Sequence, residues 1–179
     1  MGQPAHKLLF VLINVVGGIA VLGSYAYGFV AYPDAVAALW GDVPEGLIGV
    51  YTGNMFLAAT GYLLVFAYLL SQVPTDTRTG NGGLLFERLN MLYGAVLFCS
   101  ALWMPLSFAL LDAPNQDLWW CIRAVLLTTG IAAIVIGLQV HRHAVQRGRL
   151  FKVALAGYLF FCLQTAVLDA LIWPAFFPI

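Results

Sequence analysis

Residues 118–140 read LWWCIRAVLLTTGIAAIVIGLQV, and this stretch decides the fold. It contains one charged side chain, Arg123, among apolar, small and hydroxyl-bearing residues. About 20 helical residues cross the hydrocarbon core of a bilayer, so the stretch is long enough to span a membrane as a helix. We therefore expect an integral membrane protein built of helices.

Four further apolar stretches of similar length accompany this one. They cover residues 8–31, 47–70, 86–111 and 151–173. Helix-ending chemistry separates them, because prolines follow or precede the spans and Asn115 or Asp117 can cap the fourth helix. With 62% hydrophobic and 9% charged residues and a mean hydropathy of +0.90, the chain has too little polar surface for a soluble globule. The predicted fold class is all-α, a single domain over residues 1–179 with five transmembrane helices.

The basic residues predict the orientation of this bundle. With five spans, one side holds seven of the eight Lys and Arg residues: Lys7, Arg78, Arg88, Arg142, Arg147, Arg149 and Lys152. Basic residues in short loops are retained on the cytoplasmic side of a membrane. We expect the N-terminus inside and the C-terminus outside. The sequence does not identify the membrane.

Two charged residues lie well inside the apolar spans and away from the first three residues at either end, Arg123 in the fourth and Asp169 in the fifth. A charge at bilayer depth is costly unless it is paired, hydrated or close to the interface, and such residues mark candidate functional sites. Both are expected about 6 to 9 Å below the outer boundary, given a rise of about 1.5 Å per residue. They either form a pair in a shared polar pocket or reach separately to the interface.

All five tryptophans fall on the predicted outer side of the bundle. They are Trp40, Trp103, Trp119, Trp120 and Trp173. An aromatic belt decorates both membrane interfaces, so this one-sided placement has two interpretations: half of a belt, or the lining of an outward-facing apolar pocket. The loop 32–46 is long enough to fold over such a pocket as a lid.

Polar and small residues recur at helical spacing in the second and fifth spans. The second carries Tyr51, Asn54, Ala58, Gly61, Val65 and Tyr68, and the fifth carries Tyr158, Cys162, Thr165, Asp169 and Trp173. Residues three and four apart share one helix face, so each set predicts a face toward the bundle interior. These faces are either packing seams or part of a binding site.

Several kinds of chemistry lack the residues that they need. The three cysteines, Cys99, Cys121 and Cys162, form no Cys-x-x-Cys motif, and the three histidines lie only at the inner ends of the helices. We assign no catalytic residue and no metal ligand. An enzyme that modifies a lipid with Asp169 as its acid or base stays an alternative.

Two segments resemble the translocator protein family, also called tryptophan-rich sensory proteins. Residues 157–161 (GYLFF) and 167–169 (VLD) are similar to the family pattern Pro-Tyr-Leu-x-Trp followed by x-x-Leu-Asn, with Gly157 and Asp169 in place of Pro and Asn. Residues 100–105 (SALWMP) with Phe108 are similar to Asn-x-x-Trp-Ser/Thr-Pro and a following Phe. The resemblance implies a five-helix homodimer that binds a porphyrin or sterol under its first loop.

The expected function is binding of a hydrophobic porphyrin-, sterol- or isoprenoid-like molecule in an outer-side aromatic pocket, with a role in transport or sensing. A subunit of a larger membrane complex is the main alternative. Besides porphyrin or lipid no cofactor is expected. The expected partners are membrane lipids, the hydrophobic small molecule, and either a second copy of the protein or a larger membrane complex. No nucleic-acid partner is expected. The candidate ligand-binding residues are Tyr51, Asn54, Tyr158, Thr165 and Asp169 with Arg123 and the five tryptophans, Trp40, Trp103, Trp119, Trp120 and Trp173.

Overall fold

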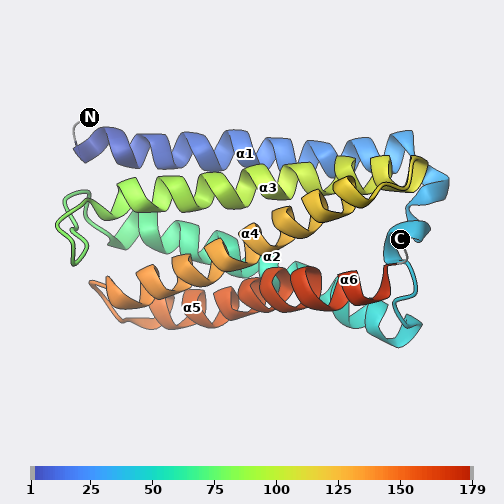
Figure 1. Cartoon of the computed structure of the whole chain (residues 1–179). Helices are drawn as coiled ribbons and strands as arrows, with labels where there is room; N and C mark the ends of the chain where they lie inside the picture. Colours follow the sequence, from blue (N-terminus) through green and yellow to red (C-terminus); the bar gives the residue numbers. More distant parts are fainter. Residues whose placement is uncertain (1–2, 178–179) are drawn as a thin grey trace.

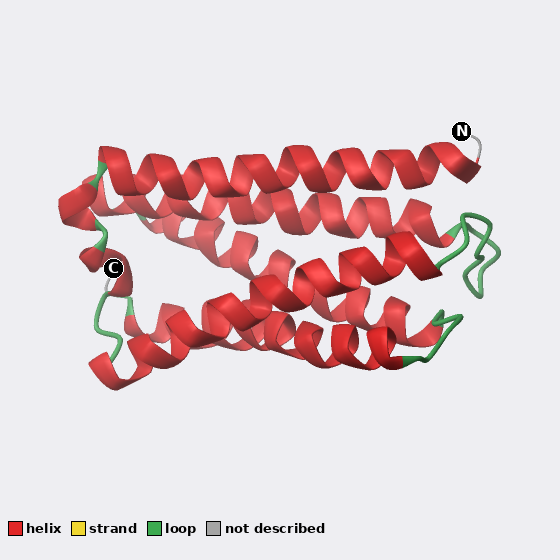
Figure 2. Ribbon diagram, turned by 180° about the vertical axis from the view of Figure 1, so that it is seen from behind, coloured by secondary structure: helices red, strands yellow, loops and turns green. Residues whose placement is uncertain are grey.

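A computed structural model describes residues 3–177, and five helical rods make up nearly all of it. The first four are α1 (Gln3–Ala31), α2 (Glu45–Gln72), α3 (Leu85–Asp112) and α4 (Gln116–Arg142). The fifth joins α5 (Arg149–Cys162), the π-helical segment η3 (Leu163–Ile172) and α6 (Trp173–Phe176). Figure 2 shows helices and loops and no strand within these described residues. The all-α prediction is confirmed, and all five rods are long and apolar enough to cross a membrane.

The bundle has two chemically different ends. The start of α1 and the segments 73–84 and 143–148 form one end, which we call the basic end (Figure 1). The opposite tryptophan end comprises residues 32–44, the turn 113–115 and Phe177. Its first loop contains two short 3-10 helices, η1 (Pro33–Ala35) and η2 (Ala37–Trp40). At this end the Asn115 side chain caps α4 by accepting from the backbone N–H of Asp117 at 2.7 Å, so Asn115 is the cap of the two that the sequence allows.

Helices that are neighbours in sequence are not always neighbours in space. α1 packs on α3, α3 on α4, α4 on η3 and α5, and α5 on α2. Side-chain contacts between α1 and α2 lie toward the basic end, where the rings of Phe10 and Phe66 are 5.4 Å apart and Tyr62 donates to Asn14 Oδ1 at 2.5 Å. Figure 1 shows the two helices separating toward the tryptophan end.

The closest helix contact joins α2 and α5 through two glycines. A Cβ on Gly61 would overlap the backbone carbonyl of Gly157, so only a residue without a side chain permits this approach. The interior face predicted for the second span is confirmed, since Tyr51, Asn54, Ala58, Gly61, Val65 and Tyr68 are all buried. This contact sets the position of the α2 side chains against the fifth rod.

Replacing Gly61 by alanine tests that contact. The new methyl group must push the two backbones apart, so we expect Gly61→Ala to lower the free energy of unfolding by about 1–3 kcal/mol. Gly53→Ala is the matched control, because a Cβ at Gly53 of the same helix meets no atom within 4 Å. Thermal unfolding in detergent measures both variants. Equal stability of the two would contradict the close α2–α5 contact.

Candidate functional site

The π-helical segment η3 brings together two polar side chains of the fifth rod. Gln164 Nε2 donates to Asp169 Oδ1 at 2.7 Å, although the residues are five positions apart. In an α-helix, positions three and four apart face each other, whereas the π-helix closes its turns between residues five apart. The wider turn therefore places Gln164 directly beside the Asp169 carboxylate.

Asn54 of α2 extends this pair across the helix interface. Its side-chain amide donates to Gln164 Oε1 at 2.9 Å and to the backbone carbonyl of Phe160 at 3.1 Å. Tyr51, one turn away, donates to the backbone carbonyl of Leu168 at 2.7 Å. The polar groups of α2 thus hold η3 at two levels and orient Gln164 toward Asp169.

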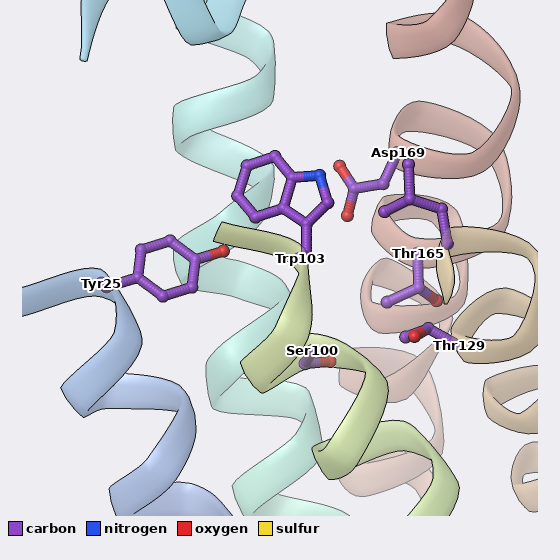
Figure 3. A pocket seen from close by; sticks show the side chains of 7 residues that line it. Tyr25, Ser100, Trp103, Thr129, Thr165 and Asp169 are labelled. Atoms are coloured by element: carbon purple, nitrogen blue, oxygen red, sulfur yellow. The ribbon is translucent and has the colours of Figure 1, made fainter. Parts of the chain in front are cut away.

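A small polar cavity adjoins the Asp169 carboxylate. Its volume is about 50 Å³, and it is lined by Tyr25, Ser100, Trp103, Leu126, Thr129, Thr165 and Asp169. These residues come from α1, α3, α4 and η3, so four of the five rods meet there. In Figure 3 the indole nitrogen of Trp103 lies toward the Asp169 carboxylate, with the Tyr25 hydroxyl on the other side of the indole. Such a cavity holds a small polar group and not a ring system.

Asp169 differs from every other acidic residue of the protein. The other seven Asp and Glu side chains are exposed, whereas Asp169 is partly buried among helices. Within residues 3–177 it has no ion-pair partner, and Gln164 supplies its hydrogen bond. Trp103 Nε1 is buried and has no hydrogen-bond partner. The cavity therefore presents an acceptor and an unused donor to the same small space.

Arg123 and Asp169 do not form an ion pair among the described residues. Of the two arrangements expected from the sequence, the direct pair is therefore absent. The Arg123 guanidinium is 5.8 Å from the centre of the Trp119 ring, one turn earlier in α4, and its Nε is buried without a partner. The half-buried side chain thus rests on an aromatic face at the tryptophan end. The two charges share an end of the bundle but not a contact.

Tryptophans close the bundle above the cavity. Trp173 contacts both Trp103 and Trp119, with ring centroids 6.0 Å apart in each case. The first loop lies over this cluster, where the carbonyl of Leu39 accepts from Trp173 Nε1 at 2.7 Å. The amide of Asp42 donates to the carbonyl of Phe176 at 2.8 Å. The loop thus covers the aromatic cluster, in the position expected of a lid.

The remaining predicted site residues lie at different places. Trp40 packs edge-on against Tyr51 beside the cluster, with centroids 5.6 Å apart. Trp120 is 63% exposed on the outside of α4 and faces away from the cavity. Tyr158 is fully buried but lies closer to the basic end, in one core cluster with Tyr93. Of the predicted residues, the cavity itself gathers Trp103, Thr165 and Asp169.

Sequence reasoning missed Gln164, Tyr25 and Thr129, and it named Ser100 only for the family resemblance. A polar side chain in a lipid-grade segment is a signal in itself, since each needs a hydrogen-bonding partner there. Gln164 was missed because it falls off the α-helical spacing that joins Thr165 to Asp169. Only a π-helical register brings it into the site.

Comparison with known proteins provides no template for this arrangement. No protein-family model, curated protein or solved structure matches the chain.

A double-mutant cycle on Asn54 and Gln164 tests the polar link between α2 and η3. We expect each single alanine substitution to destabilise the fold by about 1–3 kcal/mol, because it leaves a buried polar partner unsatisfied. The coupling energy should be about 0.5–2 kcal/mol in favour of the pair. Unfolding in detergent measures the four proteins. A coupling energy of zero would mean that the two amides act independently.

Proposed function

We propose that this protein binds an apolar molecule carrying a hydroxyl group, such as a sterol- or isoprenoid-like alcohol, with the hydroxyl in the Asp169 cavity. The observation that supports this is the unpartnered Trp103 Nε1 near the Asp169 carboxylate. A hydroxyl group both donates and accepts. It can donate to Asp169 and accept from Trp103, and so satisfies both groups at once.

The size of the cavity supports a ligand with a small head. A volume of about 50 Å³ accommodates a hydroxyl and its neighbouring carbon atoms, while sites for drug-sized molecules occupy roughly 300–1,000 Å³. The apolar body of the ligand must then lie outside the cavity, among helices and lipid. Since the contacts between α1 and α2 described above are at the basic end, we propose that the body leaves between these helices at the tryptophan end.

Charge favours an alcohol over a porphyrin among the expected ligands. Porphyrins of biological pathways carry carboxylates, and Asp169 would repel a second negative charge that has no cation beside it. Arg123 is the only cation deep in this half of the bundle, and it lies over Trp119. With the basic end on the inner side of the membrane, as the positive-inside rule suggests, the ligand would be taken from the outer leaflet, in a transport or sensing role.

Tryptophan fluorescence provides the test, with farnesol and farnesyl acetate as probes. Farnesol should change the emission of the purified protein saturably, and the acetate, which cannot donate, should bind at least about tenfold more weakly because a hydrogen bond to a charged group is worth about 1.5–3 kcal/mol. Cholesterol serves as the sterol probe in the same assay.

Two variants and one control localise the binding. Trp103→Phe should weaken farnesol binding about two- to tenfold, the value of one neutral hydrogen bond, and Asp169→Leu should weaken it more. Trp120→Phe removes an exposed indole and should leave the affinity unchanged. Equal affinity for farnesol and its acetate in the folded wild-type protein, or no saturable change with any alcohol, would overturn the proposal.

A further inference from the structure

Unpartnered polar atoms continue from the cavity toward the basic end of the bundle. Among the described residues, six buried side-chain polar atoms have no hydrogen-bond partner. One is Arg123 Nε, and the other five belong to residues that extend from the cavity along α3, α4 and α5: Trp103, Tyr158, Tyr93, Asn90 and Gln139. Buried polar atoms without a protein partner are where proteins hold internal water.

A middle level of this series consists of tyrosines. Tyr93 and Tyr158 are fully buried in one core cluster. The Tyr62 ring is 5.4 Å from Tyr93 and 5.3 Å from Phe161, and Phe161 is 5.3 Å from Tyr158. Of the three tyrosines only Tyr62 uses its hydroxyl, to donate to Asn14. Two free hydroxyl groups therefore lie in one aromatic cluster deep in the apolar bundle.

A lower level lies near the basic end. α3 begins and α4 ends at this end of the bundle. Asn90 is five positions (90 − 85) from the start of α3 and Gln139 three positions (142 − 139) from the end of α4, so both lie within about 8 Å of the basic end along their helices. Each has an unpartnered side-chain oxygen there, and His143 contacts the backbone carbonyl of Gln139 at 3.0 Å where α4 ends.

We propose that these atoms line a hydrated proton path between Asp169 and the basic end of the bundle. Thr129 and Thr165 connect the cavity to the tyrosine level, and Asn90 and Gln139 hold water at the lower level. This function goes beyond alcohol binding and shares with it the cavity residues Trp103, Thr129, Thr165 and Asp169.

The path works by proton exchange along hydrogen bonds. A proton from the tryptophan end adds to a carboxylate oxygen of Asp169 and gives the neutral acid. The acid releases it to a water, and each following water or tyrosine hydroxyl accepts one proton on its oxygen while it releases its own to the next acceptor. No other residue changes its charge, and one proton leaves at the basic end for each that enters.

Water must bridge the stretches between polar levels. Thr165 and Tyr158 are seven positions apart, about 10 Å along the helix, which three or four hydrogen bonds of about 2.8 Å can span. The titratable groups nearest Asp169 are Tyr25 of α1 and Tyr51 of α2, and Arg123 of α4 makes no ion pair with it. Proton binding at Asp169 is thus not suppressed by an adjacent cation.

Proton uptake by proteoliposomes that contain a pH-sensitive dye tests the path. Under a potassium diffusion potential set by valinomycin, the wild-type protein should acidify the lumen faster than protein-free vesicles. Asp169→Asn should reduce the rate to that of protein-free vesicles, and Tyr158→Phe and Tyr93→Phe should each lower it severalfold.

Tyr68→Phe is the matched control for the tyrosine variants. Tyr68 is equally buried, but its hydroxyl already donates to the Gln146 carbonyl at 3.3 Å, away from the path, so the rate should not change. Folding of every variant is checked by thermal unfolding, and a misfolded tyrosine variant is replaced by Gln139→Leu, for which a severalfold loss is also expected.

Alcohol binding separates this proposal from the preceding one. Tyr158→Phe should bind farnesol with wild-type affinity while its proton flux falls. A folded wild-type protein without flux above protein-free vesicles, or an Asp169→Asn variant with wild-type flux, would overturn the proton path whatever the result of the binding assay.

Discussion

The structure depends on keeping one carboxylate, Asp169, without a basic partner among helices that are apolar enough to cross a membrane. An unpaired charge in an apolar environment costs several kcal/mol unless dipoles replace the lost water. The protein supplies such dipoles in a chain from Asn54 to Gln164 to Asp169. This series of hydrogen bonds requires α2 to lie close to the fifth rod. It also requires the π-helical turn, which directs Gln164 toward the carboxylate.

Small residues allow α2 and α4 to approach the fifth rod closely. Gly61 and Gly157 bring α2 and α5 into backbone contact, and Gly130 of α4 does the same against Ala166 of η3. The π-helical segment is therefore held between two helices at short range. Because lipid provides no hydrogen bonds, the backbone groups that a wider turn rearranges must find partners inside the protein, as the Leu168 carbonyl does with Tyr51.

Much of this architecture could be predicted from the sequence, because hydropathy and helical spacing are local properties. They predicted the five spans to within a few residues, Asn115 as one of two possible caps, and six of the seven buried residues of α2, Leu69 being the exception. The π-helix could not be predicted, since it arises from packing between distant helices. Gln164 could not be predicted as a site residue for the same reason, because an α-helical register places it away from Asp169. Adjacent Trp119 and Trp120 also differ in a way that composition cannot show, with 4% and 63% of their surface exposed.

The arrangement of α1 makes its two halves depend on different neighbours. α1 packs along α3, and its side-chain contacts to α2 through Phe10 and Asn14 lie near the basic end. Seventeen residues of α1 (31 − 14) extend beyond Asn14 toward the tryptophan end. This half of α1, which carries Tyr25 of the cavity, is therefore positioned mainly by α3 and the first loop.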